Sequence, residues 1–259
     1  MGSTLRIIAS GLTSQQRNLD VIANNIANLQ TPGFKRTRLE FKDLAYRALS
    51  QIEADEGQVH LVGGSQGSGV QVNATQLMLS QGTLQETHNP LDLALDGPGF
   101  FAVQLRGGTL AYTRAGNFAL DAQNRIVNHD GLPLAPGITL PEGATLVRVD
   151  SQGVVWAQVP GGEIENVGQI VAARFANPEG LAAIGHNLFV PTVASGPATT
   201  APPGTPGYGV LHSGALEQGN VDLPDEIARL LQAQRAYQLG LRALHVWDQI
   251  AERAVNVRR

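Results

Sequence analysis

Apolar residues recur at alternating steps of three and four along the first part of the chain. The recurring positions are Leu5, Ile8, Leu12, Gln15, Leu19, Ile22, Ile26 and Leu29, with one polar member. This heptad spacing predicts an amphipathic helix that packs against other helices. Thr31, Pro32, Gly33 and Phe34 follow, and we expect the chain to turn out of the helix there. Proline disfavours helical conformation in the residue before it, and glycine allows positive φ.

A second heptad pattern lies near the end of the chain, after a helix-start signal at Asp222–Glu226 that combines acidic residues with an early proline. Its members are Ile227, Leu230, Gln234, Tyr237, Leu241 and Leu244. Short isolated helices are marginal in water, so both helices need partners. We expect them to pair as a coiled coil, with each other or with the same helices of other copies.

Between the two helices the apolar period changes to two, or to short apolar runs. Stretches such as "GVQVNATQLML", "GFFAVQL" and "GVVWAQV" are bounded by Gly, Pro, Asn or Asp turns. No helix-length segment separates them, which argues against a parallel sheet. The predicted fold is therefore α+β, with a mostly antiparallel β domain between the helices. The predicted divisions are a terminal-helix domain (1–32 and 222–259), a connecting segment (33–68) and a β-rich domain (69–221).

The off-seam face of the first helix carries small and amide side chains where a solvated helix carries charge. These residues are Ala23, Asn24, Asn25, Ala27 and Asn28, and no charged residue occurs between Asp20 and Lys35. Asparagine is a mediocre helix former, so propensity does not explain it. Such a face suits close packing against several neighbours, with amides hydrogen-bonding across the contacts. The candidate assembly residues are Leu12, Leu19, Ile22, Asn24, Asn25, Ile26, Asn28, Leu29, Ile227, Leu230, Gln234, Arg235, Tyr237, Leu241 and Leu244.

Composition removes several classes of function. The 259 residues include no cysteine, which excludes disulfides and thiolate metal sites, and the net charge of −4 gives no reason to expect nucleic acid as a partner. The first residues lack the apolar run of a secretory signal, and no stretch approaches the roughly 18 apolar residues of a membrane span. We expect no cleavable signal peptide and no membrane insertion.

Motifs for catalysis or cofactors are weak. Residues 63–67 form a literal G-x-S-x-G around Ser65, but a nucleophile elbow needs a helix after the serine, and a strand-like stretch follows. The six histidines show no zinc-ligand spacing. We predict no catalytic residue, no metal and no cofactor. A β-rich hydrolase using Ser65 and a monomeric binding module held by a helical hairpin remain as alternatives.

The chain resembles a known family over nearly its whole length. "SGLTSQQRNLDVIANNIANLQTPGFKRTRLEFKDL" (10–44), "SQGTLQETHNPLDLALDGPGFFAVQ" (80–104), "YTRAGNFALD" (112–121), "FANPEGLAAIGHNLFV" (175–190) and "LEQGNVDLPDEIARLLQAQRAYQLGLRALHVWDQI" (216–250) occur in colinear order. They are similar to segments of the flagellar rod and hook axial proteins. "FKDLAYRAL" (41–49) and the acidic, Gly-rich stretch after it are most similar to the distal rod member. The proximal rod member is the alternative.

The resemblance implies a structural subunit, not an enzyme. It implies export through the flagellar export apparatus and polymerisation into a hollow helical rod in the periplasmic part of the basal body. There the helices would form an inner layer and the β domain an outer one. The implied partners are further copies, the neighbouring proximal rod and hook proteins, and the ring bushing around the rod. One departure concerns Asn124, where the family often has glycine; Asn tolerates positive φ, so we expect the turn to persist.

Overall fold

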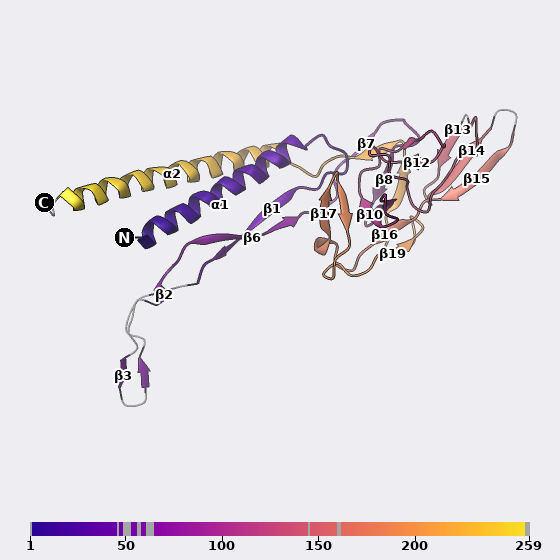
Figure 1. The fold of residues 1–259 in the computed structure, drawn as a ribbon. Coiled ribbons are helices and arrows are strands. Elements are labelled where there is room, and N and C mark those ends of the chain that lie inside the picture. The colour runs from indigo at the N-terminus through magenta and orange to yellow at the C-terminus, as the bar shows by residue number, and fades with distance from the viewer. Residues whose placement is uncertain are drawn as a thin grey trace. The chain divides into compact units, whose positions relative to one another are not determined.

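The computed structural model describes residues 2–45, 47–48, 53–55, 58–60, 65–144, 146–159 and 162–256. Figure 1 shows the chain, with a helix at each end and strands between. The helices are α1 (Gly2–Ala27), α2 (Leu223–Asn256) and the short 3-10 helix η1 (Pro178–Gly180). The strands are β1 (Thr37–Asp43), β2 (Arg47–Ala48), β3 (Glu53–Asp55), β4 (Gln58–His60), β5 (Ser65–Gln66), β6 (Val70–Leu77), β7 (Leu84–Glu86), β8 (Leu93–Asp96), β9 (Phe100–Gln104), β10 (Leu110–Thr113), β11 (Ala119–Leu120), β12 (Ile126–Val127), β13 (Leu146–Val149), β14 (Val154–Gln158), β15 (Ile164–Gln169), β16 (Ala172–Arg174), β17 (Ala182–Gly185), β18 (Leu188–Val190), β19 (Thr199–Ala201), β20 (Val210–Ser213) and β21 (Ala215–Glu217).

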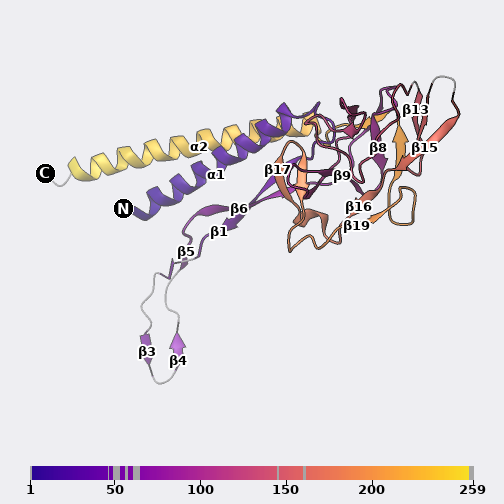
Figure 2. The same cartoon turned by 45° about the vertical axis from the view of Figure 1, so that its right-hand side comes forward.

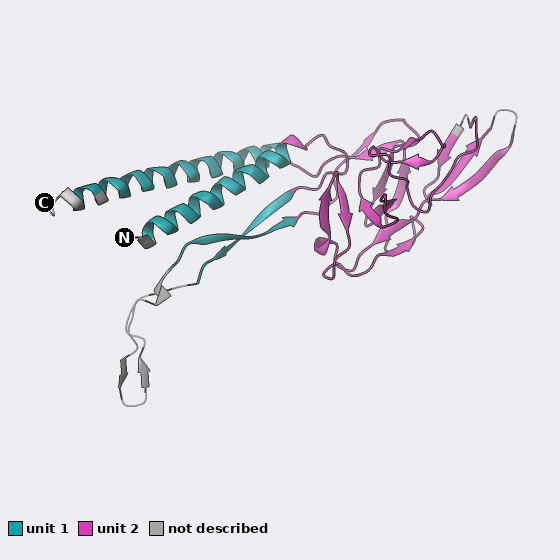
Figure 3. Ribbon diagram, viewed as in Figure 1, with its two compact units in different colours: residues 1–26, 37–76, 223–259 teal, residues 27–36, 77–222 magenta. Residues whose placement is uncertain are grey.

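The chain forms two compact units, coloured separately in Figure 3. Unit 1 contains residues 1–26, 37–76 and 223–259, and unit 2 contains residues 27–36 and 77–222. Parts of the predicted connecting segment, at residues 46, 49–52, 56–57 and 61–64, lie outside the described residues.

In unit 1, helices α1 and α2 lie side by side in both views (Figures 1 and 2). They run antiparallel. Leu12 in the first half of α1 packs over Gly240 near the middle of α2, whereas Asn25 near the end of α1 reaches Glu226 at the start of α2. Strand β1 pairs with β6 in the same unit. Helix α1 ends at Ala27, so Leu29, the last member of the predicted heptad pattern, lies in the turn beyond it.

Unit 2 is built on a six-stranded sheet with the order β17-β18-β10-β9-β16-β19, whose neighbouring strands pair antiparallel. Strand β9 is buried on both faces and separates two apolar clusters. Phe101 and Val103 point into the larger cluster, and Phe100 points into the smaller one. There the Phe100 ring meets the ring of Phe175 edge to face at 5.8 Å, a favourable arrangement for aromatic pairs. Unit 2 also contains a three-stranded antiparallel sheet with the order β13-β14-β15.

The predicted α+β class, with terminal helices and antiparallel sheets between them, is confirmed. The turn at Asn124 also persists, because this residue has a φ of 56° without glycine.

Candidate assembly interface

The predicted seam of α1 is only partly covered within the chain. Ile22 is buried, and Leu12, Leu19, Ile26 and Leu29 are half-buried. Of the asparagines on the off-seam face, Asn24 is exposed and Asn28 is half-buried. The third, Asn25, is buried, at 1% exposed.

The Asn25 amide pairs with both backbone polar groups of Thr37, the first residue of β1. Its Nδ2 donates to the Thr37 carbonyl at 2.9 Å, and its Oδ1 accepts from the Thr37 N–H at 3.0 Å. The same Nδ2 lies 3.4 Å from Oε2 of Glu226 in α2. Asn25 thus joins α1, β1 and α2 within one chain, and needs no second copy to satisfy its amide.

The inward side of α2 differs from the predicted seam at alternate positions. Of that seam, Leu230, Tyr237, Leu241 and Leu244 are half-buried, but Ile227 and Gln234 are exposed. Arg235, a candidate assembly residue outside the seam, is exposed as well. The covered line instead passes through Glu226, Leu230, Ala233, Tyr237, Gly240 and Leu244.

Small side chains explain this displacement. Ala233 is buried, and a Cβ atom added to Gly240 would lie 2.7 Å from a methyl carbon of Leu12. Ala and Gly at these positions let α1 approach closely. The heptad pattern did not include Ala233 and Gly240, because it was defined by large apolar residues. These two small residues are seven positions apart, and that spacing could have indicated a closely packed face.

Large apolar residues of α2 are left on its outer surface. Leu223, Ile227, Leu231 and Leu239 are between 38% and 62% exposed, and they lie on one i, i+4 row that Arg235 completes. We call these four residues the α2 ridge. Such rows are the surface features that helices use to pack against each other. Val246 and Ile250 continue the exposed apolar surface toward the end of the helix.

A groove of about 630 Å³ lies in unit 1 between α1, β1 and α2. Its walls combine apolar side chains, such as Val21 and Phe41, with polar ones, such as Gln15 and Gln232. Unit 1 therefore carries both a convex apolar row and a concave surface.

The chain turns out of α1 through residues packed against the β-rich unit. Gly33 has a φ of 68°, and its N–H donates to the Glu217 carbonyl at 2.7 Å. A Cβ atom on Gly33 would lie 2.3 Å from the backbone nitrogen of Ala115, so only glycine fits this approach. Phe34 is buried beside it, and the Pro32 carbonyl accepts a hydrogen bond from Asn187 at 3.2 Å.

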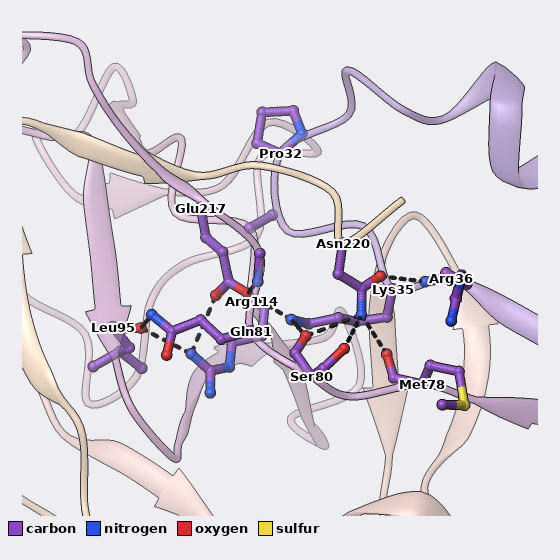
Figure 4. A network of polar contacts seen from close by, with 12 residues as sticks. Pro32, Lys35, Arg36, Met78, Ser80, Gln81, Leu95, Arg114, Glu217 and Asn220 are labelled. Carbon is purple, nitrogen blue, oxygen red and sulfur yellow. Dashed lines mark hydrogen bonds and ion pairs between the residues drawn. The ribbon is translucent and has the colours of Figure 1, made fainter. Parts of the chain in front are cut away.

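Figure 4 shows a buried charge cluster next to this turn. Nζ of Lys35 lies 2.5 Å from Oε1 of Glu217, and Nη1 of Arg114 lies 3.2 Å from Oε2 of the same carboxylate. Lys35 also donates to the Ser80 carbonyl at 2.8 Å, and Arg114 to the Leu95 carbonyl at 3.0 Å.

Burial lowers the pKa of both cations in this cluster, because it removes water from the charged groups. It lowers the pKa of Lys35, an effect that the field of Glu217 only partly offsets. Burial likewise lowers the pKa of Arg114, again against the opposing field of Glu217. The cluster is therefore a structural ionic contact that binds the segment after α1 to the segment before α2.

Asn220 makes a second connection between the same two segments (Figure 4). Its Oδ1 accepts from the Arg36 N–H at 2.7 Å, and its Nδ2 donates to the carbonyls of Met78 at 2.6 Å and Ser80 at 2.9 Å. Through these contacts Glu217 and Asn220 fix the path of the chain between β21 and α2.

The residues that the structure describes show neither a nucleophile elbow nor a metal site. Ser65 begins strand β5, and the next described element is strand β6, without the helix that a nucleophile elbow requires. Within the described ranges, no three His, Asp or Glu side chains are grouped to hold a metal ion. Neither described helix of sufficient length is apolar enough to cross a membrane.

Comparisons with known proteins agree on one family. Family models match three parts of the chain: "Flagella basal body rod protein" at residues 5–35, "Flagellar hook protein FlgE/F/G D1 domain" at 94–157, and "Flagellar basal body rod FlgEFG protein C-terminal" at 212–257. The chain is 44% identical to the flagellar basal-body rod protein FlgG of Caulobacter vibrioides, over 98% of each chain. It is 39% identical to FlgG of Bacillus subtilis, over 96% of this chain and 97% of the relative. Identity to the basal-body rod protein FlgF of Caulobacter vibrioides is 31%, over 99% of this chain and 98% of the relative.

Proposed function

Because this chain belongs to the FlgG family of flagellar basal-body rod proteins and is a structural subunit of the distal rod, we propose that its terminal helices build a continuous helical polymer. In this polymer α1 and α2 form a coiled-coil inner layer around a hollow axis, and residues 69–221 form the outer layer. The polymer transmits torque from the motor to the hook.

The α2 ridge is the observation that carries this proposal. Four large apolar side chains on one row are 38% to 62% exposed, although residues beside them on the same helix are buried. Burying a side chain of this size contributes about 1.5–3 kcal/mol, so a surface that covers the row gains substantial free energy. A second copy offers such a surface in the groove between α1, β1 and α2.

Ridge and groove are different surfaces, which favours an open polymer. When one surface of a subunit binds a different surface of the next, the contact repeats without closing unless the rotation happens to form a ring. A rod needs this head-to-tail arrangement. The predicted seam residues that are only half-buried, such as Leu12, Leu19 and Ile26, give further apolar surface for the same layer.

The distal position is supported over the proximal one by a comparison within one organism. The chain is 44% identical to FlgG and 31% identical to FlgF of Caulobacter vibrioides, at nearly equal coverage. We place the proximal rod protein and the hook protein at the two ends of the polymer as neighbours, and the ring bushing around it in the periplasm.

The route to that place is export in an unfolded state through the flagellar export apparatus. The absence of cysteine suits a chain that crosses a narrow channel and folds afterwards, because no disulfide can form prematurely. The role is structural, and Ser65 takes no part in catalysis.

Ile227→Asp tests the proposal, with Leu120→Asp in β11 as its matched control, since the two apolar residues are similarly exposed at 43% and 39%. Light scattering against protein concentration and negative-stain imaging measure assembly. We expect rods from the parent chain and from Leu120→Asp, but only monomers from Ile227→Asp, because a charge then lies in a buried contact. A parent chain that stays monomeric at every concentration, or rods of normal length from Ile227→Asp, would overturn the proposal.

A further inference from the structure

Val193 stands entirely in solvent, at 104% exposed, in the turn between β18 and β19 of unit 2. A single exposed apolar residue is ordinary on a protein surface. This one differs because the turn that carries it, residues 191–196, is held by hydrogen bonds on both sides of the exposed side chain.

Two hydroxyl groups define that turn. The Thr192 N–H donates to the Ser195 hydroxyl at 2.8 Å, and the Thr192 hydroxyl accepts from the Ala194 N–H at 3.1 Å. Ser195 is completely buried, although it lies only two residues after Val193. The peptide around Val193 is therefore closed on itself, with the apolar side chain projecting from it.

The turn is also anchored to η1 and the residue before it. The Thr192 hydroxyl donates to the Gly180 carbonyl at 2.6 Å, and the Asn177 side chain donates to the Ala194 carbonyl at 3.1 Å. A Cβ atom on Gly180 would lie 2.7 Å from the Ala194 carbonyl carbon, so the two backbones are in direct contact. Because the backbone that carries Val193 is already ordered, little backbone entropy is lost when this side chain is buried in a partner.

A pocket of about 400 Å³ lies next to η1 in the same unit, because Pro178, the first residue of η1, is part of its lining. Its apolar lining includes Leu79, Pro98, Phe100, Phe175 and Pro178. The described surface of unit 2 thus carries an apolar projection and an apolar hollow close together.

Charges near the two features are complementary. The exposed carboxylate of Glu179 lies next to Gly180, to which the Val193 turn is bonded. The exposed Arg174 lines the pocket. Seating a second copy's Val193 in the pocket would bring its Glu179 toward Arg174, and complementary charges at the rim of an interface favour correct docking.

We propose that Val193 of one copy inserts into this pocket of the next copy, forming a contact between neighbouring β-rich units. The inference rests on the proposed polymer and names a contact in its outer layer. Projection and pocket are distinct surfaces, so the contact is head-to-tail and propagates along the same polymer that the helices build.

Single cysteines test the contact directly, because the chain has none of its own. One preparation carries Val193→Cys and the other carries Ala176→Cys, at an exposed residue of the pocket lining. The two are mixed, assembled and treated with a copper–phenanthroline oxidant, which accepts the two electrons released when two thiols form a disulfide. Each chain has one thiol, so a product that joins the two variants must link two copies.

We expect a reducible dimer of the two variants in the assembled mixture and none in a dilute, unassembled one. Ile184→Cys, which replaces an exposed apolar residue of β17, is the matched control for Val193→Cys and gives no such dimer with Ala176→Cys. Rods that form without this dimer, or that give it equally with the control, would overturn the proposal.

Val193→Asp provides a second measurement. Because the side chain makes no buried contact within its own copy, the free energy of unfolding of the monomer stays unchanged, while the concentration needed for assembly rises by about tenfold. If the parent chain assembles and Val193→Asp assembles at the same concentration, this contact is wrong and the helix polymer stands. If the parent chain does not assemble at all, the proposed function fails first.

Discussion

Lys35 and Glu217 form a buried ion pair in which Nζ lies 2.5 Å from Oε1 and each side chain is only 1% exposed. Lys35 follows the turn out of α1, and Glu217 ends β21 just before the chain continues to α2. The pair therefore joins two points 182 residues apart in the sequence. Arg114 adds a second cation to the same carboxylate, so Glu217 is the counter-charge that the two buried cations share.

Glu217→Gln tests the importance of this compensation. The substitution keeps the side chain's shape but leaves Lys35 and Arg114 without a counter-charge, and breaking a buried pair in this way costs about 3–5 kcal/mol. Urea unfolding followed by tryptophan fluorescence, which reports Trp156 in unit 2 and Trp247 in α2, measures the loss. Glu165→Gln, on the exposed surface of β15, is the control and changes stability by less than about 0.5 kcal/mol. Equal stability of the two variants would show that the cluster contributes little.

Asn25→Ala tests the connection between α1 and β1. Removing the amide leaves the N–H and carbonyl of the half-buried Thr37 without this partner, which costs about 1–3 kcal/mol. Hydrogen exchange at the Thr37 amide is the most direct measurement, and we expect it to accelerate by at least about tenfold. Gln16→Ala removes an exposed amide from the same helix and leaves that exchange rate unchanged. An unaltered Thr37 amide in the Asn25 variant would contradict the assignment.

Asp121→Asn tests a pH dependence in the turn between β11 and β12. The Arg125 N–H, which donates to Oδ1 at 2.8 Å, is the main cause that lowers the pKa of Asp121 below its ordinary value of 3.8. Since the pKa is lower in the folded state, the ionised carboxylate contributes stability that is fully present above pH 3.8. That contribution is lost as the pH falls through the lower folded-state value.

Thermal unfolding between pH 5 and about pH 2 measures this loss of stability at acidic pH. We expect the Asn variant to lose less stability than the parent chain over that range. Arg125→Met removes a side chain but keeps the backbone donor, so it should retain most of the acid dependence. Parallel pH profiles of the parent chain and Asp121→Asn would exclude the carboxylate as the source.

The fold class follows from the spacing of apolar residues, but the faces of the helices do not. Heptad steps identify α1 and α2 because apolar residues recur with the period of a helix. The inward side of α2, by contrast, depends on Ala233 and Gly240, whose small size matters only when Leu12 of the other helix is in place. A pattern of large residues cannot reveal a contact made by small ones.

Asn25 and Lys35 illustrate a second limit. Their partners, Thr37, Glu226 and Glu217, are polar residues placed by tertiary contacts, and polar residues show no periodic signal. The absence of charge around Asn25 predicted a face covered by other copies. Within one chain Asn25 is covered by β1 and α2, whereas its neighbour Asn24 is exposed. The turn at Gly33 was easier to predict, since proline followed by glycine marks a break in a helix.

Small inward residues and large outward ones make α2 sensitive to its length more than to its composition. One residue inserted between Arg229 and Ala233 rotates the rest of the helix by about 100° about its axis. Leu239 then takes the place of Gly240 opposite Leu12, where a Cβ atom alone would lie 2.7 Å from a methyl carbon of Leu12 and force that side chain to move. Every apolar residue beyond the insertion also leaves the row that faces outward. An insertion or deletion within this helix therefore disturbs its packing more than an exchange between residues of similar size.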